Sequence, residues 1–209
     1  DASTLYVVYQ PKASVNIRYV DDRGNPIDVT GVAGTQEKIS GLRGEVYEVN
    51  TPDIEHYTFE RMYLTTPGDA VYSAVLNANT HEVTLNKEYA STVTVVYRAK
   101  ASFTIEYIDD HGNTINDLMP AGTPFSHSGH RDDVFDILTP IITDYDFISM
   151  EIVHPEVGGV ANESATLDPN THKATMKAGY NSIVKVYYHA KGSVAIEYED
   201  ELGSLINFE

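Results

Sequence analysis

A strand-and-turn segment occurs three times in this chain, and the repetition limits the folds open to it. Residues 12–35 and 100–123 are identical at 13 of 24 positions without a gap, where unrelated segments would share about one or two. A weaker third copy occupies residues 191–206, so the copies begin 88 and then 91 residues apart. This period is far longer than the roughly 20–50 residues of solenoids and propellers, so each copy can enclose a small core of its own.

The alignment of the copies predicts the domain boundaries. We expect two complete repeats, at residues 13–99 and 101–190. Residues 1–12 align with the last strand of a repeat, so we assign them to a preceding one, and residues 191–209 would be the first hairpin of a third. An isolated strand cannot offset its own ordering entropy, so residues 1–12 should be disordered unless something holds them. Our hypothesis is that they pair with the C-terminal hairpin of another molecule or pack on an adjacent complete repeat. If Leu5, Val7 and Tyr9 instead bond into the sheet of Val15, Ile17 and Tyr19, the domain begins near residue 1.

Two further expectations concern the spacing between the copies. The register shifts by three residues between Phe147 and Leu167, which places an insertion at the glycine-rich stretch Val157–Val160. The two repeats should otherwise be superimposable, with one strand order. Only Arg98–Ala101 separates the last strand of one repeat from the first strand of the next, which predicts a short linker and an end-to-end string of domains.

The charge of the chain excludes some classes of partner. Its 31 Asp and Glu against 14 Lys and Arg give a formal charge of −17, which repels phosphate backbones and anionic lipid headgroups. We expect no nucleic-acid binding. No apolar run approaches the roughly 20 residues that cross a bilayer, so we expect no membrane insertion in this segment. The chain has no cysteine, which fits a cytosolic or a Gram-positive surface protein better than a disulfide-built ectodomain.

Alternation with a period of two predicts that the first segment of every copy is a strand with one buried face. Asp22–Asn25 and Asp110–Asn113 contain residues that accept positive φ, and we expect each to close a hairpin. Asn77–Thr80 and Asp168–Thr171 predict a second hairpin in each repeat. The apolar positions of the first strands are Val15, Ile17 and Tyr19, then Phe103, Ile105 and Tyr107, then Val194, Ile196 and Tyr198.

One short helix per repeat is also expected. In the second repeat, apolar residues at helical spacing follow Asp132, a candidate N-cap, and run to Pro140. The matching stretch Glu45–Asn50 also fits an extended strand. Two hairpins, a short helix and a final strand make an α+β, strand-dominated domain of the β-grasp (ubiquitin-like) kind, with the helix across one face of a mixed sheet. The apolar residues at helical spacing are Val134, Ile137, Leu138 and Ile141.

The motif Tyr-(Val/Ile)-Asp-Asp-x-Gly-Asn-x-Ile at Tyr19–Ile27 and Tyr107–Ile115 resembles that of the mucin-binding-protein (MucBP-like) repeats of Gram-positive surface adhesins. The resemblance extends to Gly41–Gly44, to a Thr-Pro pair and to the aromatics Tyr57 and Tyr145. The second repeat departs from the pattern, with Asp132 in the place of Gly44, and the third copy has Asp200-Glu201 in the place of Asp-Asp.

The resemblance implies an extracellular, cell-wall-anchored adhesin that contacts mucin glycoproteins or their glycans, with immunoglobulin as a further partner. Repetition suits such a role because many weak sites on one chain raise the effective concentration. A stalk that projects a binding region elsewhere is the alternative. A third alternative is binding of a protein strand at an open sheet edge. We expect a monomer that can make end-to-end contacts, and the residues that bind the ligand stay unknown.

No cofactor is expected. The acid pairs Asp21/Asp22 and Asp109/Asp110 could begin a calcium site with Asn25 or Asp28, but EF-hand spacing is absent and a turn bonded to its own backbone is favoured. His127 and His130 resemble half a metal site without a third ligand, so a solvated loop is favoured and no metal residue is assigned. His81 and His172 follow hairpin turns, which favours a structural role.

No catalytic residue is assigned, because the chain lacks the motifs of a nucleophile elbow, a phosphate loop or a zinc helix. Carboxylate pairs could in principle act as acid and base, yet most surface carboxylates are only solvated. We therefore expect a protein that is not an enzyme. Tyrosines on a strand face suit glycan or peptide contact, but the core is favoured for Tyr19, Tyr107 and Tyr198. The roles of Tyr6, Tyr63, Tyr72 and Tyr187 stay open.

Overall fold

The structure is a computed structural model that describes residues 3–67, 74–86, 91–157, 160–161, 163–192, 197–199 and 202. Within these residues the chain is built from strands, and the only helical element is the 3-10 turn η1 (Asn116–Leu118). The chain divides into two compact units. The first holds residues 1–101, 128–133 and 176–179, and the second holds the remainder.

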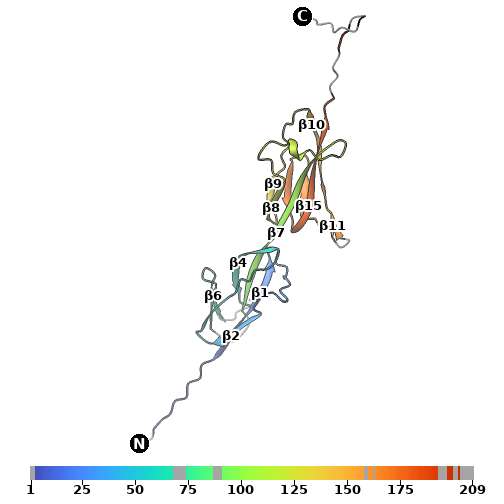
Figure 1. Ribbon diagram of the computed structural model, residues 1–209. Helices are drawn as coiled ribbons and strands as arrows, with labels where there is room; N and C mark the ends of the chain where they lie inside the picture. Colours follow the sequence, from blue (N-terminus) through green and yellow to red (C-terminus); the bar gives the residue numbers. More distant parts are fainter. Residues whose placement is uncertain are drawn as a thin grey trace. The chain divides into compact units, whose positions relative to one another are not determined.

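The first repeat forms a mixed sheet, in which β1 (Lys12–Asp21) lies between two neighbours. It pairs antiparallel with β2 (Lys38–Leu42) and parallel with β7 (Thr92–Asp109). On its other side β7 pairs antiparallel with β4 (Tyr57–Thr65), which gives the order β4-β7-β1-β2 (Figure 1). A smaller sheet has the order β3-β6-β5, with strands β3 (Val46–Glu48), β6 (Glu82–Leu85) and β5 (Ala74–Asn77).

Alternation places one side of this sheet in the core. Val15 and Tyr19 of β1 are 1% and 5% exposed, and they pack with Val95 of β7 and Met62 of β4. The smaller sheet contributes Leu85, which is fully buried. Each aliphatic side chain buried in this way contributes about 1.5–3 kcal/mol to stability. This contribution is larger than that of the exposed polar residues that alternate with it. Tyr19 and Tyr107 are both buried, as expected.

The second repeat has the same strand order. Strands β10 (Tyr145–Val153), β15 (Gly179–Ala190), β7 and β8 (Ser126–His130) follow one another as their counterparts do in the first repeat. The smaller sheet, of β13 (Ala165–Asp168), β14 (Lys173–Met176) and β9 (Val134–Asp136), also repeats its order. Backbone bonds coincide as well, since Ile17 donates to Glu37 and Ile105 to Phe125, both at 2.8 Å. The prediction of one shared strand order is confirmed.

The expected insertion falls on an extra hairpin. Strands β11 (Glu156–Val157) and β12 (Val160–Ala161) pair antiparallel and have no counterpart among the described residues of the first repeat. Residues 158–159 of the turn, and residues 68–73 at the corresponding place in the first repeat, lie outside the described part of the chain. The size of the backbone difference at this point therefore stays a prediction.

Two expectations about local structure are wrong. Residues 134–136 form strand β9 and not a helix, because they pair with β14, where Thr175 lies opposite Val134. Arg98–Ala101 is not a linker, because it lies inside β7. Ala99 and Ala101 are buried and alternate with Arg98 and Lys100, so the period of two continues through these four residues.

The turns behave largely as expected. Gly24 and Gly112 both have φ of 83°, a left-handed conformation that glycine adopts without strain. After each turn the returning chain makes a single bridge, Val20 to Pro26 and Ile108 to Thr114, so the expected hairpins are shorter than two full strands. The turns at Asn77–Thr80 and Asp168–Thr171 join β5 to β6 and β13 to β14, as predicted.

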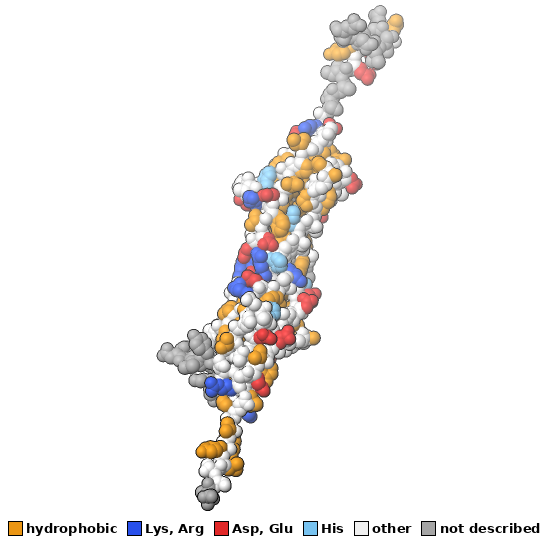
Figure 2. Space-filling model, turned by 90° about the vertical axis from the view of Figure 1, so that its left-hand side faces the viewer, with side chains coloured by type: hydrophobic (Ala, Val, Ile, Leu, Met, Phe, Trp, Pro, Cys, Tyr) orange, Lys and Arg blue, Asp and Glu red, His pale blue; other side chains and the backbone are white. Residues whose placement is uncertain are grey.

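The segment before the first repeat is extended and exposed. Residues 3–11 belong to no strand, and Leu5 and Tyr9 are each 87% exposed. Figure 2 shows apolar side chains along this end of the chain. The first strand of the sheet of Val15, Ile17 and Tyr19 begins at Lys12. Among the described residues of the segment, only its end is bonded beside that sheet, since Gln10 Nε2 donates to the Arg43 carbonyl at 2.8 Å and the Pro11 carbonyl accepts from Arg43 N at 2.9 Å. Most of the third copy, including Val194, Ile196 and Asp200-Glu201, lies outside the described residues.

Candidate functional site

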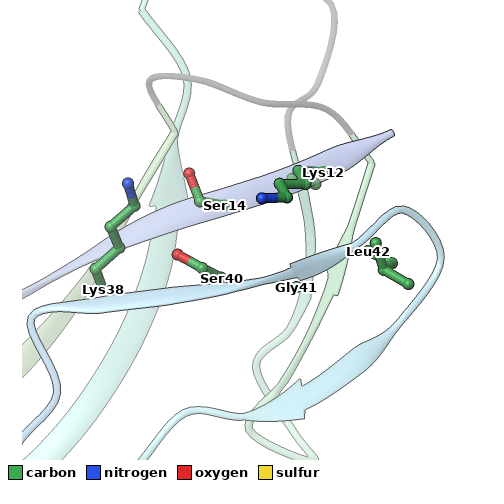
Figure 3. Close-up of a pocket in the computed structure, with 7 residues that line it drawn as sticks. Lys12, Ser14, Lys38, Ser40, Gly41 and Leu42 are labelled. Atoms are coloured by element: carbon green, nitrogen blue, oxygen red, sulfur yellow. The ribbon is translucent and has the colours of Figure 1, made fainter. Parts of the chain in front are cut away.

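The face of the first sheet that points away from the core carries the candidate site. On β1 and β2 the residues that alternate with the core are polar, and the register sets Ser14 opposite Ser40 and Asn16 opposite Lys38. A hollow of about 350 Å³ lies over these strands. Figure 3 shows the two serines between Lys12 and Lys38, with both hydroxyls on the same side of the strand pair. The hollow therefore offers two ammonium groups and two hydroxyls.

The same face continues across β7 and β4. The Arg18 guanidinium donates to the Thr94 hydroxyl at 3.4 Å, which holds this side chain along the sheet. On β4, Arg61 forms an ion pair with Glu60 at 2.7 Å, and Tyr63 is 43% exposed. Basic groups, hydroxyls and one aromatic ring thus share one surface. We call the exposed part of this surface the outer face of the first repeat: Lys12, Ser14, Asn16, Arg18, Lys38, Ser40, Leu42, Arg61, Tyr63, Thr65 and Thr92. Thr94 and Val96 of β7 lie on the same side of the sheet but are buried.

The equivalent face of the second repeat has a different charge. Glu106 stands where the first repeat has Arg18, Ser126 where it has Lys38, and Glu151 where it has Tyr63. Glu151 accepts a hydrogen bond from the Tyr187 hydroxyl at 2.6 Å. This bond, with burial and the charges of Glu151 and Glu106, raises the pKa of Tyr187 to about 12. The two repeats therefore share a frame and present unlike surfaces.

The acid pair of the first repeat already holds a cation from the chain. Arg131 Nη1 lies 3.1 Å from Asp21 Oδ2 and 2.7 Å from Asp22 Oδ1, inside the first compact unit. Asp21 also accepts from the backbone and side chain of Asn25. Burial alone would raise the pKa of Asp21, but the bonds from Asn25, Arg131 and Arg23 lower it below the ordinary value. Asp28 caps Thr30 instead of joining this cluster.

The acid pair of the second repeat has the same internal bonds. Asp109 accepts from Asn113 and His111, and the Asn113 side chain is the main reason that its pKa is lowered. Asp110 forms an ion pair with His189. The first acid of each pair thus bonds its own turn, as the favoured interpretation predicts, whereas Asp22 and Asp110 pair with a basic side chain distant in the sequence. The calcium alternative gains no support. Within the described residues no group of three His, Asp or Glu side chains is placed to hold a metal ion.

The histidines of β8 do not form a site together. His127 stacks on Phe135 with ring centroids 4.5 Å apart, whereas His130 contacts Thr58. The Nε2 atom of His127 is buried without a hydrogen-bond partner in the described part of the chain, and burial lowers the pKa of this ring. The expectation of a solvated loop is wrong, because both residues lie on a strand.

His81 and His172 are structural, as expected. Both adopt positive φ, 57° and 53°, directly after a turn. Their rings pack on Phe59 and Phe147, with centroids 5.0 and 5.3 Å apart. Each carbonyl accepts a bond at 2.7 Å from a backbone N–H, that of Val49 directly after β3 or that of Ile137 directly after β9. These bonds tie the smaller sheet of each repeat to its own turn.

The tyrosines divide into core and surface. The Tyr97 hydroxyl donates to the Pro52 carbonyl at 2.7 Å, and Tyr188 donates to Pro140 at 2.9 Å, so the Thr-Pro pair of each repeat anchors a buried ring. Tyr198 is 54% exposed, so its expected core role is wrong in this structure. Tyr6 is 83% exposed. Tyr72 lies outside the described residues.

The outer face was missed in the sequence, although part of its signal is visible there. Lys12, Ser14, Asn16 and Arg18 alternate with the apolar positions of one strand and contain no acid. What the sequence does not give is the pairing of this strand with β2 and β7, which brings Lys38 and Thr94 beside it. A search for acid-free polar positions on each expected strand would have found it.

This arrangement defines a class of protein, the tandem-repeat proteins whose repeats are small strand-built domains. The model of the MucBP domain family matches residues 14–98 and 102–189, so this chain belongs to that family, with two domains in tandem. The resemblance noted in the sequence is confirmed.

The other comparisons add little. No match was found among curated proteins. A solved structure of streptococcal high identity repeats in tandem (SHIRT) domains 3–4, from a cell surface protein, is similar to the chain at 10% identity. The match covers 86% of this chain and 98% of that one, with a TM-score of 0.25. So low a score does not define the fold or the function of this chain. None of the described helical residues forms a span that could cross a membrane.

Proposed function

We propose that this chain is a non-enzymatic segment of a bacterial cell-surface adhesin that binds mucin-type host glycoproteins weakly through each repeat. The observation that carries the proposal is the match of the MucBP family to both repeats. Supporting it, the outer face of the first repeat offers hydroxyls, cations and an exposed tyrosine on one surface, groups that hydrogen-bond and stack on sugars. The location on the cell wall of a Gram-positive bacterium belongs to the same proposal.

The fold relation is part of the proposal. The parallel pairing of β1 with β7 beside antiparallel β2 and β4 is the mixed sheet that we expected of a β-grasp domain. No α-helix lies on this sheet in the described residues, so we place the repeats beside the β-grasp domains as strand-only relatives.

The test is retention on immobilised mucin as the number of repeats increases. The 209-residue chain is compared with two and three copies of it joined end to end. Weak sites on one chain should give retention that rises much more steeply than the number of repeats, because each bound repeat raises the effective concentration of the next. Retention that is absent at every length contradicts the proposal and favours a stalk.

One observation favours a second candidate, protein binding at a sheet edge. Strand β2 has a neighbour on one side only in the described sheet, so a strand of another protein, such as an immunoglobulin chain, could pair with its free side. Pull-down of antibody fragments separates this candidate from mucin binding, provided that glycan-free fragments are used. The Ser14–Ser40 pair of the register is a non-hydrogen-bonded one, since Arg43 bonds Pro11 and Ile17 bonds Glu37, so the backbone groups of Ser40 face the free edge. A proline in place of Ser40, in the middle of β2, should abolish this pairing.

A further inference from the structure

We propose that the outer face of the first repeat is a binding site for acidic sugars, which carry a carboxylate or a sulfate ester, and that the second repeat lacks such a site. This inference rests on the proposed function and names the class of glycan and the repeat that binds it. The shared chemistry is an anionic group on a sugar ring. The following observations carry the inference from charge, from geometry and from the comparison of the two repeats.

The charge of the outer face is opposite to that of the chain. With 31 acids and 14 bases in 209 residues, eleven positions taken at random would hold about two acids and one base. The eleven positions of the outer face hold four bases and no acid. Two carboxylates lie beside them, and both have partners. Arg61 binds Glu60 at 2.7 Å, and Glu45 accepts from the Leu42 backbone at 2.7 Å and from the Tyr47 hydroxyl at 2.6 Å. Anions that the rest of the surface repels are therefore attracted to this face.

The geometry suits a sugar of several rings. Lys12 and Lys38 flank the hollow of about 350 Å³, and Ser14 and Ser40 lie between them (Figure 3). No bond of either lysine ammonium to a protein carboxylate is found in the described residues. A bound anion would thus meet two ammonium groups that form no ion pair with the acids in the described part of the chain. Charge-assisted bonds to such cations are about twice as strong as neutral ones.

The neighbouring strands extend the site. Arg18 lies diagonally across from Lys38 on the paired strands, and its guanidinium donates to Thr94 of β7, which extends the basic surface from β2 toward β7. Tyr63 lies on β4, and with strands spaced about 4.8 Å apart its ring is about 14 Å from β2, the span of two to three sugar rings. The face can therefore bind an acidic sugar at β1–β2 and stack a neutral ring on Tyr63.

The second repeat is a control that the chain itself contains. At the equivalent positions Glu106, Ser126 and Glu151 replace Arg18, Lys38 and Tyr63. The second repeat folds with the same strand order, so these replacements are compatible with the fold. Placing these residues in the first repeat should remove the proposed site. Each introduced residue already occupies the equivalent position of the second repeat, so it is compatible with the fold.

The experiment titrates the full chain with sialylated, sulfated and neutral oligosaccharides of matched backbone, and compares it with the variant Arg18→Glu/Lys38→Ser. A second variant, Lys173→Ser/Lys185→Glu, makes the same change of charge within the second repeat. Both variants lower the formal charge by three. We expect the first variant to lose about tenfold in affinity for acidic sugars, and the second variant to bind within about twofold of the original chain.

Two further measurements sharpen the result. Circular dichroism confirms that both variants keep the fold. Raising the salt from roughly 0.15 to 1 M shortens the screening length from about 8 to 3 Å, and should weaken the binding of acidic but not of neutral sugars. Loss confined to sialylated sugars identifies a carboxylate as the ligand group, and loss confined to sulfated sugars identifies a sulfate. Either result supports the inference.

Several results overturn it. These are equal losses in both variants, unchanged affinity in Arg18→Glu/Lys38→Ser, or no binding of acidic sugars by the original chain. If mucin still binds after its sialic acid and sulfate are removed, the proposed function stands while the inference fails. If acidic sugars bind but mucin is not retained at any number of repeats, the proposed function fails while the inference stands.

Discussion

Replacing Tyr97 with phenylalanine should destabilise the first repeat by about 1–2 kcal/mol. The ring is 1% exposed, and its hydroxyl donates to the Pro52 carbonyl at 2.7 Å. Phenylalanine keeps the ring packing, so the loss is the hydrogen bond, with a net value of about 0.5–1.5 kcal/mol, and the cost of a carbonyl left without this donor. Pro52 is only half-buried, so water can restore part of that cost, which sets the upper end of the range.

The assay is urea denaturation followed by far-ultraviolet circular dichroism, because the chain has no tryptophan. The free energy of unfolding falls linearly with urea concentration, and we expect the slope of this line to be unchanged. The urea concentration at the midpoint should then fall by the change in free energy divided by that slope. Tyr63→Phe is the matched control, since this ring is 43% exposed on the same sheet and no hydrogen bond of its hydroxyl is found in the described residues. Equal midpoints for Tyr97→Phe and the original chain, or an equal drop in both variants, would refute the reasoning.

The equivalent buried tyrosine of the second repeat, Tyr188, predicts a dependence of stability on alkaline pH. Burial and the nearby Tyr107 raise the pKa of Tyr188 to about 12, above the value of about 10 in an unfolded chain. Between these values the unfolded chain releases a proton that the folded chain keeps, so stability is full below pH 10 and falls as the pH rises. Tyr188→Phe should flatten this fall while lowering the stability at pH 7.

Three more outcomes are expected. His127→Ile, which copies Ile39 of the first repeat, should abolish a loss of stability on acidification. Burial lowers the pKa of His127, so the unfolded chain binds the proton before the folded chain does as the pH falls through about 6.5. Denaturation at pH 8 and pH 5 measures this loss of stability. Gly44→Ala should cost about 1–2 kcal/mol of stability because φ is 90° there, although the added side chain would meet no clash. Gly192→Ala, which also lies in open space, should be near neutral. Thermal melts compare the two variants. Lys173→Ala should change stability by less than about 1 kcal/mol, because its ion pair with Asp136 is exposed, and a larger drop in the same melts would contradict this.

The strands of the core could be predicted because their signal is local. Val15 and Tyr19 alternate with polar residues, and alternation over four or more residues specifies a half-buried strand without knowledge of the partner strand. The repeat made the prediction stronger, since the same alternation occurs at Phe103 and Tyr107. The turn at Gly24 was equally predictable, because few residues other than glycine accept its φ of 83°.

The helix at Val134 was predicted wrongly because a short apolar run fits either period. Residues at helical spacing need about ten positions to exclude a strand, and Pro140 ends this run sooner. Pairing with β14 decides the conformation, since Phe135 lies opposite Ala174, and no property of the segment itself reveals that partner. The continuation of β7 through Ala99 was missed for another reason: alanine has a weak strand preference, so its alternation was not counted.

Asp132 shows how a position can keep its backbone while its side chain takes a new role. The first repeat has Gly44 there, at φ of 90°, and Asp132 adopts the same region at 68°. Aspartate enters this region at a cost that most other residues would exceed. Its carboxylate lies 3.4 Å from the Arg23 guanidinium, an exposed pair of small value. The turn requires a positive φ at this position, which either glycine or aspartate can adopt. The motif position therefore reflects backbone geometry and not a contact with a ligand.

The same separation of frame and surface explains why the family motif does not locate the ligand. The motif residues Asp21, Gly24 and Asn25 bond one another and close a turn, so they are constrained by the fold. The residues that differ most between the repeats, such as Arg18 against Glu106, point outward and are not constrained by it. A binding surface on such a frame can change charge from repeat to repeat at little cost in stability. Specificity in an array of this kind therefore has to be assigned to each repeat from its own outward positions.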